Sequence, residues 1–518
     1  MNHSNFLVVG SGLAGLSFAL RAAELGEVTV ITKKALMDSN SSLAQGGIAA
    51  VLGADDSFEN HIDDTIRVGK GLCDRRAVEL LVRRGPELIG WLMGLGVEFD
   101  RMGDVLDLGK EGGHSRRRVA HSGDLTGSAV QEVMVQRVKE SPAIEIREKV
   151  VAVDLVVHEG SCRGIRALDV ERSRLVNFQA PVTVLATGGV GQLYAKTSNP
   201  AVATGDGVAM AWWAGAELAD MEFTQFHPTV LNVGTSPFFL ISETVRGEGG
   251  ILRNNSEEAF MKGIHRLGDL APRDIVSRAM VEEQKRGQVY LDVRHKGEPF
   301  LRRRFPTIYQ RCAEEGYSMV RDLIPVSPAA HYLCGGIKVN EYGETSIPGL
   351  LAFGECSCTG IHGANRMASN SMLECLVFTS LAFEKIRPHE GSVDLSPMER
   401  EVQIVDTPEA HVLRSHLQDV MWDSTGINRS VAGLKQVIVE LREIEERAES
   451  LLSRGMNTDL IELHSMVAVA RLITRAALTR RESRGTHYLA DHPRRDDENW
   501  LKHIVFKGNR IKVEDHRT

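Results

Sequence analysis

A chain of 518 residues can fold into about three domains with a large hydrophobic core. The net charge of −8 at pH 7 excludes a general electrostatic attraction to nucleic acid, so local arginines must bind any anionic ligand. The seven cysteines form no zinc-type array, and no signal peptide or run of eighteen apolar residues is present. We therefore expect a cytoplasmic protein without a metal, a membrane or nucleic acid as partner. The close pair Cys356 and Cys358 is interpreted as two small core residues rather than as ligands or a redox couple.

The first 32 residues predict a βαβ unit. A buried strand at 6–9 leads into Gly10-Ser11-Gly12-Leu13-Ala14-Gly15, an apolar helix through Leu25 and a second strand at 28–31. In this order the first glycine allows the turn, the second admits a pyrophosphate and the third lets the helix pack on the strand. The alternative is a purely structural glycine turn.

The second strand ends in Thr32-Lys33, where an acid usually binds a ribose hydroxyl. Lys33 fits either the 2′-phosphate of NADP or a position near an adenosine. Two further buried strands are predicted, one over 182–189 that ends in the glycine turn Gly188-Gly189 and one over 350–355 that ends in the acid Glu355. A nucleotide domain assembled from such distant segments is typical of FAD enzymes.

We predict an α/β fold with a Rossmann-like FAD-binding domain, an inserted α+β capping domain and a C-terminal helical bundle. The FAD-binding domain takes residues 1–234 and 331–390, the capping domain 235–330 and the helical domain 396–518. Apolar residues at three- and four-residue spacings over 434–452 and 460–478 predict two helices. The linker is placed at Pro388–Pro397, and Arg302-Arg303-Arg304 is interpreted as a solvated face.

Five arginines follow in the helical region. They can form surface and interdomain ion pairs, the interpretation we favour, or they can dock a partner or RNA. They are Arg471, Arg475, Arg480, Arg481 and Arg484.

The segment Gly360–Ser371 places Arg366 among small residues just before an apolar helix. Small residues let the backbone approach a ligand, and a helix N-terminus offers free N–H groups to an anion. The arginine fork suits a carboxylate. The alternative is a capping loop whose arginine pairs with a structural acid.

Motifs along nearly the whole chain resemble the flavoprotein family of succinate dehydrogenase, fumarate reductase and L-aspartate oxidase. They are Ala44-Gln45-Gly46-Gly47, Gly205-Asp206-Gly207, Gln225-Phe226-His227-Pro228-Thr229, Arg246-Gly247-Glu248-Gly249, Ala271-Pro272-Arg273-Asp274, His331-Tyr332 and Glu482-Ser483-Arg484-Gly485.

Two positions distinguish members of this family. Where membrane-linked members carry the flavin on a histidine, this chain has Asn40, which implies non-covalent FAD. The run Lys110-Glu111-Gly112-Gly113 carries an acid that the dicarboxylate dehydrogenases lack. Because aspartate adds an ammonium to its two carboxylates, Glu111 is expected to bind that ammonium. The alternative for Glu111 is a loop acid paired with Arg116 or Arg117.

The resemblance implies roles for further residues. Arg273 is the acid/base group, an arginine that needs a carboxylate neighbour to relay protons, either Asp274 or Glu243. Arg366, His227 and His331 clamp the substrate carboxylates, with Gln225, Ser242 and Glu243 beside them.

The implied FAD contacts are Gly10, Ser11, Gly12, Leu13, Ala14, Gly15, Lys33, Asn40, Ser41, Ser42, Leu43, Ala44, Gln45, Gly46, Gly47, Asp206, Glu355, Ser371 and Met372. A helix beginning near Ser371 would place its positive dipole near the flavin.

The implied activity is oxidation of L-aspartate to iminoaspartate, with oxygen or fumarate as electron acceptor. This reaction is the first step of de novo NAD biosynthesis and feeds a quinolinate synthase, a possible partner. The closest alternative is a soluble fumarate reductase or succinate-dehydrogenase-type flavoprotein. A more distant one is an FAD-binding RNA-modification subunit that uses the basic C-terminal helices.

Overall fold

A parallel five-stranded sheet forms the centre of the computed structural model, which describes residues 3–234, 236–387 and 399–516. Its strand order is β19-β12-β1-β2-β8, and every neighbouring pair is parallel. The strands are β1 (Phe6–Val9), β2 (Val28–Ile31), β8 (Ile144–Arg147), β12 (Val182–Leu185) and β19 (Leu350–Ala352). The predicted α/β class and the assembly of this sheet from distant segments are confirmed.

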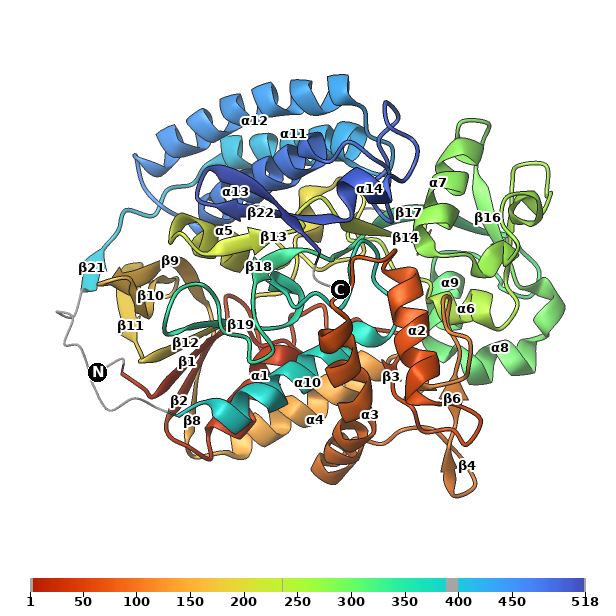
Figure 1. Cartoon of the computed structure of the whole chain (residues 1–518), viewed down its shortest axis with the longest axis horizontal. Helices are drawn as coiled ribbons and strands as arrows, with labels where there is room; N and C mark the ends of the chain where they lie inside the picture. Colours follow the sequence, from red (N-terminus) through yellow and green to blue (C-terminus); the bar gives the residue numbers. More distant parts are fainter. Residues whose placement is uncertain (1–2, 235, 388–398, 517–518) are drawn as a thin grey trace.

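Helices pack against the central sheet over a shared hydrophobic core (Figure 1). They are α1 (Leu13–Ala22), α2 (Phe58–Val68), α3 (Arg75–Leu95), α4 (Thr126–Glu140) and α10 (Asn370–Lys385). Helix α1 ends three residues before the predicted Leu25, because the chain turns there and the Gly26 N–H donates to the Ala22 carbonyl.

Two glycines of the first turn allow close backbone contact. Gly10 has φ +113°, and a Cβ there would lie 2.2 Å from the Ala186 carbonyl oxygen. A Cβ on Gly15 would lie 2.0 Å from the Gly10 carbonyl oxygen. Both positions therefore require glycine, the first for the turn and the second for packing of the helix on the strand.

A second, antiparallel sheet, which we did not predict, has the strand order β21-β11-β10-β9. It contains β9 (Val150–His158), β10 (Ser161–Asp169), β11 (Arg174–Gln179) and β21 (Glu399–Glu401). Small sheets complete this part of the molecule with β3 (Ile48–Ala49), β4 (Arg101–Met102), β5 (Val105–Leu106), β6 (Leu108–Gly109) and β7 (Val119–Ala120).

The insertion has a hydrophobic core of its own, from Leu231 to Val326. Its sheet contains β14 (Thr224–Leu231), β15 (Ile251–Arg253), β16 (Val289–Asp292) and β17 (Ile324–Leu333), and its helices are α6 (Glu243–Gly247), α7 (Arg273–Gln284), α8 (Glu298–Arg304) and α9 (Pro306–Glu314). Figure 1 shows this part at the right, in green. Arg302 and Arg303 on α8 are exposed, as the solvated-face interpretation requires.

The C-terminal region begins with three helices, α11 (Pro408–Thr425), α12 (Val431–Leu452) and α13 (Thr458–Thr479), drawn in blue at the top of Figure 1. The region does not stay helical. After α14 (Asp497–Trp500) come β22 (Lys502–Lys507) and β23 (Arg510–Asp515), joined by the two-residue turn Gly508-Asn509. This hairpin extends a sheet with β13 (Glu217–Ala219), β18 (Gly336–Lys338) and β20 (Ser357–Cys358), beside α5 (Asp206–Trp213).

Several composition-based expectations can be compared with the structure. Cys356 and Cys358 are buried in hydrophobic clusters, which confirms their interpretation as core residues. In the described ranges, no helix combines the length and hydropathy needed to cross a membrane. The predicted linker at 388–397 lies outside the described residues.

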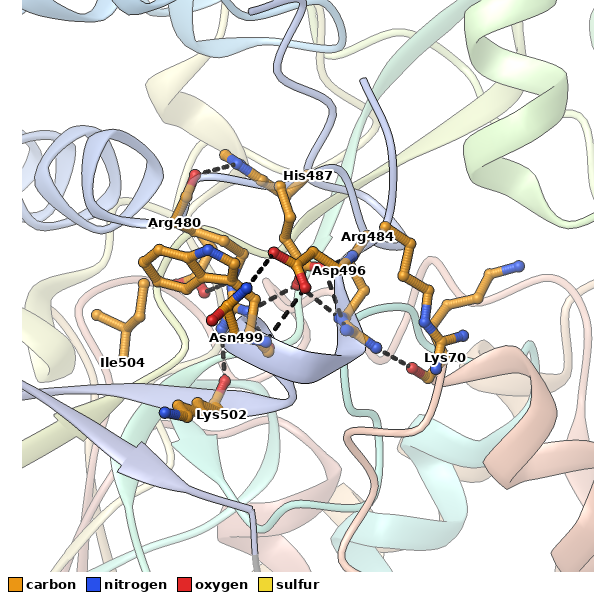
Figure 2. A network of polar contacts seen from close by, with 12 residues as sticks. Lys70, Arg480, Arg484, His487, Asp496, Asn499, Lys502 and Ile504 are labelled. Carbon is orange, nitrogen blue, oxygen red and sulfur yellow. Dashed lines mark hydrogen bonds and ion pairs between the residues drawn. The ribbon is translucent and has the colours of Figure 1, made fainter. Parts of the chain in front are cut away.

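Two arginines that follow α13, Arg480 and Arg484, connect the C-terminal region to the rest of the chain (Figure 2). Arg480 Nε donates to Glu222 Oε1 at 2.6 Å, and Arg484 Nη1 donates to the Lys70 carbonyl at 2.7 Å. Both arginines are buried, which removes them from any RNA-binding surface. The interdomain ion-pair interpretation is confirmed for Arg480.

Candidate active site

A cavity lies where the carboxyl ends of the central parallel strands meet the insertion, and it is lined by most of the predicted cofactor and substrate residues. In doubly wound sheets this edge is the usual ligand site. Three predicted residues do not line it: Gly15, which packs against Gly10, Ser42, which hydrogen-bonds to the Met37 and Ser39 carbonyls, and Gln225.

The start of α1 forms one end of the cavity. Gly12 is the N-cap and offers no side chain to the helix, while the Leu13 N–H donates to Ser41 Oγ at 3.0 Å. Two polar atoms that face this cavity, Gln45 Oε1 and Thr187 Oγ1, are buried without a hydrogen-bond partner among the described residues. A glycine cradle, a helix N-terminus and unpaired polar atoms together fit a large phosphate-containing cofactor.

Lys33 lines the same end but is not free to bind a phosphate. Its Nζ donates to Thr204 Oγ1 at 2.6 Å and lies 2.7 Å from both Asp206 Oδ2 and Glu462 Oε1. Burial opposes its charge, but the two carboxylates still raise the pKa of Lys33. Three acceptors use all three ammonium protons, so the structure does not support the 2′-phosphate interpretation.

Glu355 faces the middle of the cavity. Its oxygens accept from the Leu333 N–H at 3.0 Å and from Asn40 Nδ2 at 3.2 Å. Burial raises the pKa of Glu355 to about 7, so it is partly protonated near neutral pH and can donate as well as accept.

Arg366 lies at the other end of the cavity, above the ring of Tyr332 at 4.3 Å. Its Nη1 donates to Ser371 Oγ at the start of α10, and its Nε lies 3.4 Å from Gln225 Oε1. Burial and the nearby Arg273 lower the pKa of Arg366. No carboxylate of the described residues pairs with this guanidinium, so the structural-acid alternative is not supported.

Hydrogen bonding fixes the tautomers of the two histidines. The Thr229 N–H donates to His227 Nδ1 at 3.1 Å, so the His227 proton is on Nε2, which is buried without a partner. Arg366 Nη2 lies 3.1 Å from His331 Nε2, so Nδ1 of His331 carries the proton and donates to Ser198 Oγ at 2.8 Å. Burial and the nearby Arg273 lower the pKa of both rings well below the usual value, which keeps them neutral.

Arg273, the first residue of α7, enters the cavity from the insertion. Its Nε donates to Glu243 Oε2 at 2.6 Å, and its Nη1 donates to Gln225 Oε1 at 2.9 Å. Glu243 Oε1 also lies 3.3 Å from Arg246 Nη2. Burial opposes ionisation of Glu243, but Arg273 and Arg246 hold its pKa below the ordinary value. Glu243 is therefore the carboxylate neighbour, whereas Asp274 accepts from Asn365 at 3.1 Å.

Glu111 faces the cavity from the opposite loop. It accepts from Ser369 Oγ, and Thr244 Oγ1 donates to its other oxygen at 3.2 Å. Gly46 makes this approach possible, because a Cβ there would lie 2.4 Å from Glu111 Oε1. Arg117 instead lies 3.5 Å from Glu248, so it does not neutralise Glu111. Burial, and next the charge of Glu243, raise the pKa of Glu111.

The structure also gives roles to residues that sequence reasoning did not select. Ser198 orients His331, and Thr244 and Ser369 hold the two oxygens of Glu111. Of these three residues, only Ser369 had a sequence signal, since it belongs to the small-residue segment before α10. Gln225, which was predicted beside the substrate, does not line the cavity and instead joins Arg273 to Arg366.

The fold and this site define an FAD-dependent oxidoreductase. Residues 5–372 match the family described as FAD binding domain, and residues 414–517 match the fumarate reductase flavoprotein C-terminal domain. The chain belongs to this family of FAD flavoproteins, and FAD is its cofactor.

Relatives that align over nearly the full chain show to which members of the family this protein is similar. The chain is 45% identical to L-aspartate oxidase 1 of Ralstonia nicotianae over 508 residues, which covers 94% of this chain and 95% of the relative. It is 41% identical to L-aspartate oxidase of Acinetobacter baylyi, covering 99% and 97% of the two chains. Among solved structures, a quinol fumarate reductase of E. coli matches with a TM-score of 0.91 and 33% identity, covering 100% of this chain and 97% of the other.

Proposed function

We propose that this chain oxidises L-aspartate to iminoaspartate with FAD, and that oxygen or fumarate accepts the electrons. The reaction is the first step of de novo NAD biosynthesis, on the route to quinolinate. The observation that carries the proposal is Glu111, a buried carboxylate that faces Arg366, Arg273 and two neutral histidines across one cavity. The proposal is also supported by relatives that are named L-aspartate oxidase and that align with nearly the full chain.

The charges of the site match this substrate. Apart from Glu355, which is partly protonated and held by Asn40 and the Leu333 N–H, three buried arginines and two buried glutamates surround this part of the cavity. They leave one excess positive charge when both glutamates are ionised; the residues are Arg246, Arg273, Arg366, Glu111 and Glu243. Aspartate carries one net negative charge, so its binding neutralises the cluster. Buried charge is costly unless it is paired, and this balance favours aspartate over a neutral ligand.

Each end of aspartate has complementary groups. Arg366 presents its guanidinium fork to a carboxylate, and His227 Nε2–H is an unpaired donor for a second contact. His331 and Ser242 line the cavity beside them. Glu111 receives the ammonium, and its raised pKa makes it a suitable acceptor for the proton that the amine loses.

When bound, FAD supplies the hydride acceptor for the substrate α-carbon. The protein holds the α-carbon in place through both ends of the substrate, and such positioning can supply about 7–11 kcal/mol of the barrier reduction. In the direction of fumarate reduction, Arg273 donates a proton to the substrate carbon, and the ionised Glu243 that accepts from its Nε relays a proton from solvent to restore Arg273.

The cofactor is held without a covalent bond, since Asn40 stands where the covalent members have a histidine and its amide donates to Glu355. Lys33, Asp206, Ser371 and Met372 complete the FAD contacts. Iminoaspartate hydrolyses readily, so a quinolinate synthase that takes it up directly is the proposed partner.

A soluble fumarate reductase is the second candidate, favoured by the Arg273–Glu243–Arg246 series and the fold match. An anaerobic visible spectrum separates the two. Bleaching of the flavin by L-aspartate and not by succinate, with recolouring by fumarate, is expected. Bleaching by succinate alone would identify a dicarboxylate dehydrogenase instead.

Replacing the ammonium-binding carboxylate tests the assignment of Glu111. Glu111→Gln should lower kcat/KM for aspartate by about 10²- to 10³-fold and should not lower fumarate reduction, since fumarate has no ammonium. Glu248→Gln, which removes an acid paired with Arg117 outside the cavity, is the matched control. Equal loss of both activities in Glu111→Gln would remove Glu111 from this role.

A further inference from the structure

His114 joins the two loops that recognise opposite ends of the substrate. It follows Glu111 by three residues, and its Nε2 lies 3.0 Å from the carbonyl oxygen of Ala368, between Arg366 and Ser369. The ring is buried and does not line the cavity. His114 therefore contacts no substrate but connects the backbone of one binding loop to that of the other.

A buried arginine sets the direction of this contact. Arg118 Nη1 lies 3.1 Å from His114 Nδ1, and because a guanidinium only donates, Nδ1 is the acceptor and Nε2 carries the proton. That proton is donated to Ala368. Burial and the charge of Arg118 lower the pKa of His114 to about 4, so the ring is neutral and this tautomer persists at neutral pH.

Arg118 is itself rigidly held. Asp56 accepts from its Nε and Nη2 at 2.7 and 2.9 Å, and Asp64 accepts from its Nη1 at 2.7 Å. All three side chains are buried. Such bidentate, charge-assisted contacts fix a side chain more firmly than a single neutral hydrogen bond.

The loop of Glu111 has a second attachment to the same group. Asp64 Oδ2 accepts from both the N–H and the Oγ of Ser115 at 2.7 Å. On the other loop, Ser369 Oγ donates to Glu111. The segment from Glu111 to Ser115 is thus attached to α2 at one end and to the Arg366 loop at two points.

We propose that His114 is a positioning residue that sets the distance between Glu111 and Arg366, and that it thereby selects an amino dicarboxylate over a dicarboxylate without an amine. This inference rests on the proposed function. Aspartate must reach both loops at once, so its turnover depends on their spacing. Fumarate and succinate have no group for Glu111, and their turnover tolerates a change in that spacing.

The test compares two substitutions at one position. His114→Phe keeps the ring volume and removes both hydrogen bonds, whereas His114→Gln retains an amide N–H for Ala368. We expect His114→Phe to raise KM and lower kcat for aspartate, with kcat/KM down about 10²-fold, because an ångström-scale displacement has effects of this size. Fumarate reduction should stay within threefold, and His114→Gln should recover most of the aspartate activity.

His121→Phe is the matched control, because His121 is a buried histidine that pairs with Asp100 and lies outside the cavity. Equal loss of both reactions in His114→Phe, or unchanged aspartate kinetics, would overturn the inference. If His114→Phe does not fold, His114→Leu, which also removes both hydrogen bonds, decides. Its aspartate-to-fumarate activity ratio should fall about 10²-fold, and an unchanged ratio would overturn the inference. The wild-type protein tests the proposed function separately. If aspartate does not bleach the flavin of the wild type, the proposed function is refuted; if it does, the variants test His114 alone.

Discussion

Two clusters of buried charge in this molecule carry the same residue types and behave differently. In the C-terminal cluster, Arg480 donates to Glu222, Glu482 and the carbonyls of Trp500 and Lys502, so each guanidinium nitrogen has a partner (Figure 2). In the cavity, Arg366 contacts hydroxyl, amide and imidazole groups and pairs with no carboxylate of the described residues.

Opposite pKa shifts express this difference. Burial disfavours charge in both clusters, but nearby Glu222 and Asp220 raise the pKa of Arg480, whereas Arg273 adds repulsion and lowers that of Arg366. A fully paired arginine stabilises the fold. An arginine with incomplete pairing next to a cavity is held ready for a ligand anion.

A substitution of the cavity arginine should give the largest effect on activity. Arg366→Lys keeps one positive charge but loses the planar fork, so kcat/KM should fall about 10³-fold for aspartate and fumarate alike. Steady-state kinetics in both directions measure this loss, and the flavin absorbance of the purified variant should be unchanged. A loss confined to one substrate would contradict a shared role in carboxylate binding.

A substitution in the C-terminal cluster should lower the stability of the fold and leave catalysis unchanged. Arg480→Met leaves Glu222 buried without its arginine partner and removes one of the two arginines that pair with Glu482, which should lower the free energy of unfolding by about 3–5 kcal/mol. Urea unfolding of the holoenzyme measures the change, and kcat/KM of the folded variant should stay within about threefold. Arg481→Met, at the neighbouring exposed arginine, is the control and should change stability by less than about 0.5 kcal/mol. A catalytic defect larger than the stability defect would show that the cluster acts on the site.

A smaller effect should appear with pH. Since the pKa of Glu111 is raised, its neutral form persists to higher pH than that of an exposed glutamate. Below that pKa the cluster has two excess positive charges and suits the fumarate dianion; above it, the single excess charge suits aspartate. As pH rises through the Glu111 pKa, KM for aspartate should therefore fall and KM for fumarate should rise, each by at most about tenfold per pH unit. Parallel trends, or opposite trends that persist in Glu111→Gln, would contradict this assignment.

Local patterns predicted the parts of the molecule that depend on local physics. The strand, glycine turn and helix of residues 6–22 were predicted because each feature lies within a few residues of the next. The apolar spacing likewise predicted α12 and α13. The C-terminal hairpin was missed although its signal was present, namely alternating residues around the turn Gly508-Asn509.

The rest depended on contacts that no local pattern contains. Glu462 pairs with Lys33, and Ala368 with His114, across hundreds of residues, so neither contact had a sequence signal. Glu111 and Arg273 were selected through family motifs and Arg366 from the small-residue segment before α10, and the structure brings all three to one cavity. Their hydrogen-bond partners, such as Ser198 and Thr244, were missed because a lone hydroxyl residue has no distinctive spacing.

The ion pair between Lys33 and Glu462 has a consequence for the biogenesis of the holoenzyme. The ribosome makes the glycine turn within the first fifteen residues, but β12 and β19 come much later and α13 nearly last. Residues so far apart in the chain come together only late in folding. Nascent fragments therefore lack part of the cavity lining around Lys33, and we expect cofactor loading to wait for the nearly finished polypeptide.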